Sequence, residues 1–286
     1  MENFKQLFFG LLFFSQAILN AQYVDYSSFP KQETVLSQGA YYGTVLGCIG
    51  SLYLLADEAY YNDNRVKFHW ARNSETGNLD WFDNYHRGID KFGHLYSTSL
   101  ASQNLYFIAR RCGYDNQEAS WLAFGSSVTL LGAMEVWDAH FESWGFSVGD
   151  FIANVLGAAL PVAQQNVSFM KHINYKMSYN FLAQKSDDPG IHDYEHMTFW
   201  LTFNPLGLSG SKKQGLLSLL NIAVGYGFER YTTQKQEFYI SLDYNLKEVK
   251  VNNPYLQQLI TVLDRLHYPA PALRLAPGYI GYGLFF

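Results

Sequence analysis

Residues 238–246 read FYISLDYNL, and this stretch decides the fold class of the second half of the chain. All its even-numbered residues are apolar or aromatic, whereas tyrosine, serine, aspartate and asparagine occupy the odd positions. A period of two residues is that of a β-strand with one face against a core. The same alternation recurs in four other segments, namely 173–181, 197–203, 220–228 and 280–286. We therefore predict five half-buried antiparallel strands, rich in aromatic residues, whose apolar faces need a cover.

The residues between these strands suggest one more helix. It is predicted to run from Pro254, in its first turn, to His267, and the sequence Pro269-Ala-Pro271 behind it is typical of a break. Aromatic strands also occur in outer-membrane barrels, but five strands are too few, because bacterial barrels begin at about eight. The sheet must therefore pack on the helices, pair with a partner or lie open toward lipid, and we favour packing on the helices.

Residues 34–168 have a helical period instead. Four helices are expected: one over about 34–61, one over about 89–111, a third that carries residues 121–138, and a fourth from 147 to about 165. Asp115 or Asn116 can cap the third helix and Ser147 the fourth. The predicted fold class is α+β: an N-terminal bundle of about four helices, followed by an antiparallel, aromatic-rich sheet with one C-terminal helix. The expected regions are a signal peptide over 1–21, a helical region over 22–168 and a β-rich region over 169–286 that packs on the helices.

The helices of the first half contain long uncharged stretches. Gly39, Gly43 and Gly47 lie four residues apart, on one face of the first helix, where they would let another backbone approach closely. By length, some of these stretches could span a bilayer. Their many serine, threonine, asparagine and glutamine residues favour a buried or partly embedded bundle instead.

Composition excludes two classes of protein. The chain of 286 residues is 48% hydrophobic and only 16% charged, which excludes intrinsic disorder. Its 20 lysines and arginines against 25 aspartates and glutamates give a net charge of −5, which excludes a nucleic-acid binder that relies on bulk positive charge.

The N-terminus predicts export. Residues 1–21 combine Lys5, an apolar core and Ala21 at the cleavage position, as in a secretory signal peptide. The expected location is the periplasm or the outer membrane, with membrane association. No cysteine follows the predicted cleavage site directly, so a lipid anchor is not expected. Cys48 and Cys112 are interpreted as small core residues, with pairing left open.

Polar residues interrupt the apolar helices in a pattern that suggests one shared site. Asp90 and His94 lie one turn apart on one helix, and Glu135 and Asp138 are three residues apart on another. Ionisable groups in such places must be paired, hydrated or functional, because burying one alone costs several kcal/mol. We predict that these four converge as candidate catalytic residues. The supporting residues are expected to be Lys91, Asp150 and Asn154.

Two interpretations of this polar cluster remain open. The carboxylates and the histidine could act as acid and base or hold a divalent metal, although their spacing is not diagnostic of either. Alternatively, they form a structural network in which Lys91 balances Glu135 or Asp138.

Residues 81–165 resemble the YfiM-like family of predicted periplasmic or outer-membrane proteins. The resemblance rests on DKFGHLYSTSL at 90–100 and AMEVWDAHFESWGFSVGDFIANVLGA at 133–158. The first motif is also similar, more weakly, to VanZ-type membrane proteins. The sequences LLNIAVGYGFE at 219–229, EFYISLDYNL at 237–246 and PAPALRL at 269–275 resemble longer members found in Bacteroidota. The resemblance implies an envelope location but no activity.

Two functions follow from these observations. The first is a non-enzymatic envelope protein, structural or associated with an assembly, whose partner is an envelope protein or lipid. The second is a hydrolase or transferase that acts on an envelope lipid or glycan through Asp90, His94, Glu135 and Asp138. The sequence leaves open whether the protein is an enzyme.

Overall fold

A computed structural model describes most of the chain in two compact units. The described residues are 36–59, 64–74, 76–82, 87–180, 194–209, 216–229, 235–249, 251, 254–276 and 279–285. The predicted signal peptide lies outside them. Beyond the first 23 residues, the units are Val24–Ala163, which is helical, and Gln164–Phe286, which carries the sheet. The predicted α+β class, with helices before the sheet, is confirmed.

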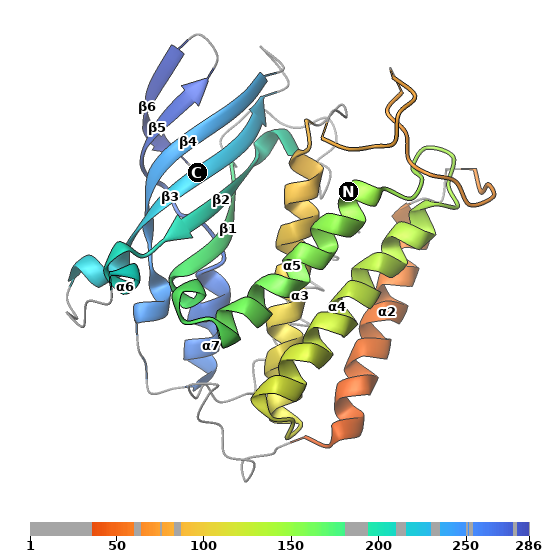
Figure 1. The fold of residues 1–286 in the computed structure, drawn as a ribbon, viewed down its shortest axis with the longest axis horizontal. Coiled ribbons are helices and arrows are strands. Elements are labelled where there is room, and N and C mark those ends of the chain that lie inside the picture. Colours follow the sequence, from red (N-terminus) through yellow and green to blue (C-terminus); the bar gives the residue numbers. More distant parts are fainter. Residues whose placement is uncertain are drawn as a thin grey trace. The chain divides into compact units, whose positions relative to one another are not determined.

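Four long helices form the first unit (Figure 1). They are α2 (Gln38–Ala59), α3 (Ile89–Arg111), α4 (Asn116–Asp138) and α5 (Val148–Asn166). The predicted caps are present. Asp115 accepts a hydrogen bond from Glu118 N at 2.8 Å, and the Glu118 side chain accepts one from Asp115 N. The two bonds form a capping box for α4. Ser147 Oγ accepts from Asp150 N at 3.1 Å, which starts α5 and fixes Asp150 in its first turn.

Close helix packing occurs at a different glycine from those predicted. A Cβ on Gly157 of α5 would lie 2.4 Å from the Leu95 carbonyl oxygen of α3, so only glycine permits this approach. The expectation for the first helix is wrong, because a Cβ on Gly43 or Gly47 would meet no described atom within 4 Å. Spacing alone showed a shared face on α2, but not whether another backbone packs there.

An irregular segment, residues 64–82, runs beside the turn that joins α4 to α5. Isolated bridges link Arg65 to Phe141 and Trp70 to Phe146. Gly145, with φ at 105°, lies so close to this segment that a Cβ there would be 2.7 Å from Ala71 N. These contacts hold the segment in place, and Asp80 near its end faces the N-terminal turns of α3 and α5.

Six antiparallel strands form the second unit in simple sequence order (Figure 1). They are β1 (Ile173–Tyr179), β2 (Met197–Phe203), β3 (Leu220–Glu229), β4 (Lys235–Tyr244), β5 (Ala270–Ala276) and β6 (Tyr279–Phe285). Five were predicted, and β5 was missed. A short helix, η3 (Ser168–His172), precedes β1, and others lie between strands: η4 (Tyr194–His196), α6 (Pro205–Leu208), η5 (Leu216–Leu219), η6 (Leu246–Glu248) and α7 (Pro254–Leu263). The predicted C-terminal helix is present as α7, but it ends before His267.

The sheet buries the opposite face from the one predicted. Along β4, Tyr239, Ser241 and Asp243 are buried, whereas the intervening apolar residues are exposed. The same holds across the register, because Val224, Ile240 and Leu273 stand opposite one another and are all 42–47% exposed. The expectation of buried apolar faces is therefore wrong for β3, β4 and β6.

A charged and hydrogen-bonded network makes this burial of the polar face possible. Lys176 Nζ lies 2.9 Å from Asp243 Oδ2 and 3.1 Å from Asp264 Oδ1, and all three residues are at most 1% exposed. Nearby, Trp200 stacks on His267 with ring centroids 3.8 Å apart. Because these groups pair with one another, they can be buried together without leaving charges unpaired.

Candidate functional site

A buried lysine at the start of α3 forms the centre of a charged group in the helical unit. Lys91 is 3% exposed, and its Nζ lies 2.8 Å from Asp90 Oδ2 and 3.2 Å from Asp150 Oδ1. It also pairs with Asp80. We call Lys91, Asp80, Asp90 and Asp150 the Lys91 cluster. Its ion pairs therefore go to three aspartates, instead of to Glu135 or Asp138 as expected.

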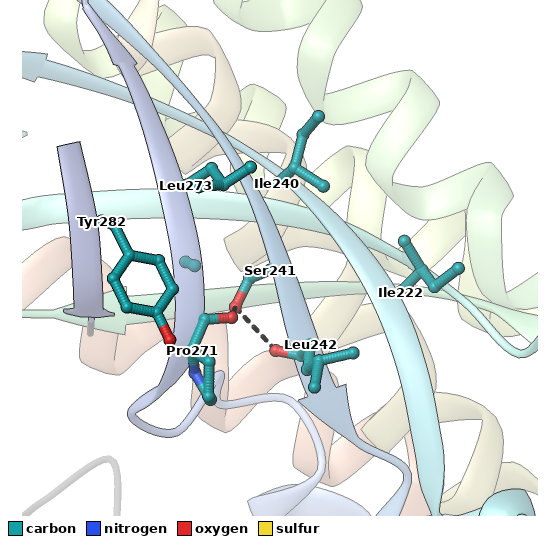
Figure 2. Close-up of a pocket in the computed structure, with 8 residues that line it drawn as sticks. Ile222, Ile240, Ser241, Leu242, Pro271, Leu273 and Tyr282 are labelled. Carbon is teal, nitrogen blue, oxygen red and sulfur yellow. Dashed lines mark hydrogen bonds between the residues drawn. The ribbon is translucent and has the colours of Figure 1, made fainter. Parts of the chain in front are cut away.

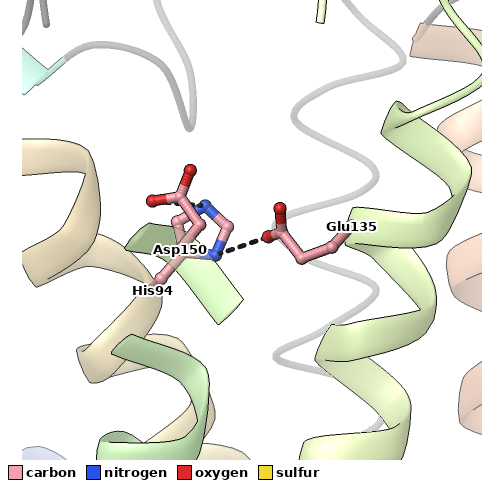
Figure 3. A group of neighbouring side chains, drawn as sticks. All are labelled: His94, Glu135 and Asp150. Carbon is pink, nitrogen blue, oxygen red and sulfur yellow. Dashed lines mark ion pairs between the residues drawn. The ribbon is translucent and has the colours of Figure 1, made fainter. Parts of the chain in front are cut away.

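A second group shares Asp150. His94 Nδ1 lies 3.3 Å from Glu135 Oε1, and His94 Nε2 lies 3.9 Å from Asp150 Oδ1. Figure 3 shows the imidazole between the two carboxylates, which come from α4 and α5. We call these three residues the His94 triad. One potential ligand atom from each lies within 4.8 Å of those of the other two.

Asn154 orients the triad from one side. It is fully buried, and its Nδ2 donates to Glu135 Oε1 at 3.4 Å while its Oδ1 lies 3.3 Å from His94 Nδ1. Thr98 Oγ1 donates to the same Asn154 Oδ1 at 2.7 Å. Three helices therefore fix the triad, α3 through His94 and Thr98, α4 through Glu135, and α5 through Asp150 and Asn154.

Burial controls the protonation of this site. Burial raises the pKa of Glu135 to about 9, and the charges of Asp150 and Asp138 act in the same direction. Burial also raises the pKa of Asp150 above its usual range, although His94 and Lys91 oppose this. Burial alone would lower the pKa of Lys91, but Asp150 and Asp90 hold it above its usual range. Glu135 can thus retain a proton at neutral pH, beside an imidazole.

The structure sorts the predicted site residues into neighbouring groups. His94 and Glu135 contact each other directly. Asp90 is linked to them indirectly: Lys91 pairs with both Asp90 and Asp150, and Asp150 also contacts His94. Asp138 lies close enough for its charge to raise the pKa of Glu135. Sequence reasoning missed Asp80, because it lies in an irregular segment without a period that could place it.

The helices that carry both groups coincide with a known sequence family. Residues 79–166 match the family model described as predicted periplasmic lipoprotein (DUF2279). The match covers 88 of the 286 residues, from just before Asp80 to the end of α5. It supports an exported, periplasmic protein of the cell envelope. It does not confirm the resemblance to the YfiM-like and VanZ-type proteins. No curated protein and no solved structure matches the chain at a significant level.

The His94 triad allows two kinds of chemistry. A protonated Glu135 beside His94 can exchange a proton, as an acid–base pair does. Alternatively, the imidazole nitrogen and the two carboxylates can bind a cation, since these are common ligands of divalent metals. Of the triad, the His94 side chain is the most accessible, with 25% of its surface exposed.

The β-rich unit offers a second candidate surface. We call it the apolar face; it consists of side chains that are 36–79% exposed on one side of the sheet. Its members are Leu201, Ile222, Val224, Phe238, Ile240, Leu242, Tyr244, Leu273, Leu275, Ile280, Tyr282 and Leu284. A hollow of about 300 Å³ on this face is lined by Ile222, Ile240, Leu242, Leu273 and Tyr282, with Pro271 beside them. Figure 2 shows these side chains.

Proposed function

We propose that this chain is a structural or assembly-associated protein of the cell envelope whose β-sheet binds a lipid membrane through its apolar face. The observation that carries this proposal is the orientation of the sheet. Strands in water normally turn their apolar residues inward and their polar residues outward. Here the charged residues Lys176, Asp243 and Asp264 are inside, while the apolar residues face out. This arrangement suits an apolar surrounding medium.

Charge favours lipid over a protein partner on this face. Within the described parts of β3 to β6, the side of the sheet that carries the apolar face has no charged side chain. Protein interfaces usually carry about one hydrogen bond per 100–200 Å² and a polar rim. Lipid hydrocarbon chains form no hydrogen bonds, so a continuous apolar sheet face without polar groups is suited to contact them.

One helix also bears on membrane association. Among the described residues, α4 is the one helix that is long and apolar enough to cross a bilayer by length and composition. Core helices of soluble proteins meet the same criterion, and Glu135 of α4 is 1% exposed among polar neighbours. The proposal therefore places the membrane contact on the sheet.

A second candidate function rests on the His94–Glu135 contact. A hydrolase or transferase that acts on an envelope lipid or glycan needs a group that gives and takes a proton. Glu135, with a pKa of about 9 and 3.3 Å from His94, has this capacity.

Flotation with vesicles tests the membrane proposal. The purified protein is mixed with neutral phosphatidylcholine vesicles in 0.5 M NaCl and centrifuged through a density gradient. We expect it to float with the vesicles, because a chain with a net charge of −5 and an uncharged contact face does not need anionic lipid. Ile240→Asp with Leu273→Asp should weaken binding about 100-fold, since each carboxylate on a lipid face costs on the order of 1–2 kcal/mol.

The matched control is Leu46→Asp with Leu156→Asp, at two exposed leucines of the helical unit. These changes add the same charge and should leave flotation intact. Wild-type protein that stays at the bottom of the gradient, or a loss of flotation that is equal in both double variants, would contradict the proposal. Protein that forms a dimer and does not bind the vesicles would also contradict the proposal, and would indicate that a second copy of the chain covers the apolar face.

A further inference from the structure

We propose that the His94 triad binds one divalent transition-metal ion, with an imidazole nitrogen and two carboxylate oxygens from three different helices as ligands. This site lies in the helical unit and does not depend on membrane binding by the sheet. His94 comes from α3, Glu135 from α4 and Asp150 from α5.

The geometry already approaches that of a metal site. Ligands about 2.1 Å from a tetrahedral metal ion lie roughly 3.4 Å from one another. The distance between His94 Nδ1 and Glu135 Oε1 is 3.3 Å. One ligand atom from each triad residue lies within 4.8 Å of the others, so the three can converge on one ion once Asp150 moves inward. The three side chains converge in Figure 3.

Asp150 provides an independent indication of a cation. The residue is 92% buried, and its Oδ1 atom accepts no hydrogen bond within the described structure. The nearest positive group is Lys91 Nζ at 3.2 Å, which also pairs with Asp80 and Asp90. The same oxygen lies 3.9 Å from His94 Nε2, so it is directed into the triad. A buried carboxylate oxygen without a hydrogen bond is a ready ligand for a metal ion.

The charges around the triad favour a divalent ion. Three carboxylates, of Asp80, Asp90 and Asp150, contact Lys91, and Glu135 adjoins this group through His94. Even with Glu135 protonated and His94 neutral, the net charge of these groups is 1 − 3 = −2, which a divalent cation balances. Asn154 Nδ2 donates to Glu135 Oε1 at 3.4 Å, so Asn154 supplies an outer hydrogen bond of the kind that metal ligands usually have.

The ligand types select the class of metal. An imidazole with two carboxylates suits zinc and manganese, whereas magnesium and calcium prefer oxygen ligands alone. We therefore use Zn²⁺ as the probe and Mg²⁺ as the comparison. The tag-free protein is stripped with EDTA, and binding is followed by titration calorimetry and by metal analysis after desalting.

We expect about one Zn²⁺ per chain, and binding of Mg²⁺ at least tenfold weaker. His94→Gln and Glu135→Gln should each weaken Zn²⁺ binding about 100-fold, because each removes one of three ligands. His140→Ala, at an exposed histidine outside the triad, is the matched control and should bind Zn²⁺ as the wild type does. Circular dichroism checks that the variants are folded, and the two triad variants test two different helices.

Three results would overturn the proposal. One is wild-type protein that binds no Zn²⁺ at 1 mM free metal. Another is equal Zn²⁺ binding by the wild type and by both triad variants, which would place the metal elsewhere. The third is loss of binding in Asp80→Asn while Glu135→Gln still binds, which would assign the ion to the Lys91 cluster instead.

Discussion

Replacing Lys176 by methionine should lower the free energy of unfolding by about 3–5 kcal/mol, the cost of removing one partner from a buried ion pair. Lys176 is fully buried, and its Nζ contacts Asp243, Asp264 and the Tyr244 carbonyl oxygen, the last at 2.7 Å. Methionine fills a similar volume but removes the cation from Asp243 and leaves Asp264 with Lys247 at 3.9 Å. Urea unfolding at pH 7, followed by circular dichroism, measures the change.

Two further variants separate this effect from a general loss of lysine. Lys171→Met, at an exposed lysine just before β1, should change the stability by less than about 0.5 kcal/mol. Lys176→Met with Asp243→Asn should recover part of the loss, because the double variant also removes one of the two carboxylate charges that Lys176 compensates. A loss below 1 kcal/mol in Lys176→Met would mean that the buried polar face does not depend on this ion pair.

Stability should also fall as the pH rises, and Glu135 should account for much of the fall. Its pKa is about 9 in the folded protein against an ordinary value of 4.5, so the folded state holds a proton that the unfolded state lacks between these two pH values. The stabilisation by this proton is complete below pH 4.5 and is lost as the pH rises toward 9. Between pH 5.5 and 8 we expect a loss of about 3 kcal/mol.

The Glu135→Gln variant isolates this contribution, because glutamine stays neutral throughout. In buffer with EDTA, its free energy of unfolding should depend less on pH than that of the wild type. Some dependence should remain, because the pKa of Asp150 is raised as well. The other titratable neighbours, Asp138, His94 and Lys91, stay in place in this comparison. Glu142→Gln, at an exposed glutamate, should keep the wild-type pH dependence, and an equal slope in wild type and Glu135→Gln would contradict the assignment.

The sequence predicts the elements of this fold well where the pattern is local. The caps at Asp115 and Ser147 and the helical bounds at Ile89 and Arg111 are confirmed, because capping and periodicity depend on neighbouring residues. Strand β5 was missed because its prolines suggested a break. The last residue pair between β4 and β5 is Ser241 with Ala272, so Pro271 lies just outside this ladder. Its missing N–H therefore costs no hydrogen bond to β4.

The orientation of the sheet could not be predicted from the same pattern. Alternation shows that a strand has two different faces, but not which face is covered. Here the covered face is polar because Lys176 meets Asp243 and Asp264, which lie 67 and 88 residues further along the chain. Such pairing depends on tertiary contacts, and no local signal reveals it. Asp80 in the Lys91 cluster was missed for the same reason.

A fluorescent label on the apolar face tests the central claim most directly. With Cys48 and Cys112 replaced by alanine, Ile240→Cys carries an NBD group, and the protein is mixed with phosphatidylcholine vesicles that contain brominated acyl chains. If the sheet binds hydrocarbon, the NBD emission shifts to shorter wavelength and the bromine atoms quench it, whereas NBD on Glu142→Cys stays water-exposed and unquenched. A label at position 240 that keeps its emission in water and escapes quenching, at lipid concentrations where the protein floats, would contradict the account.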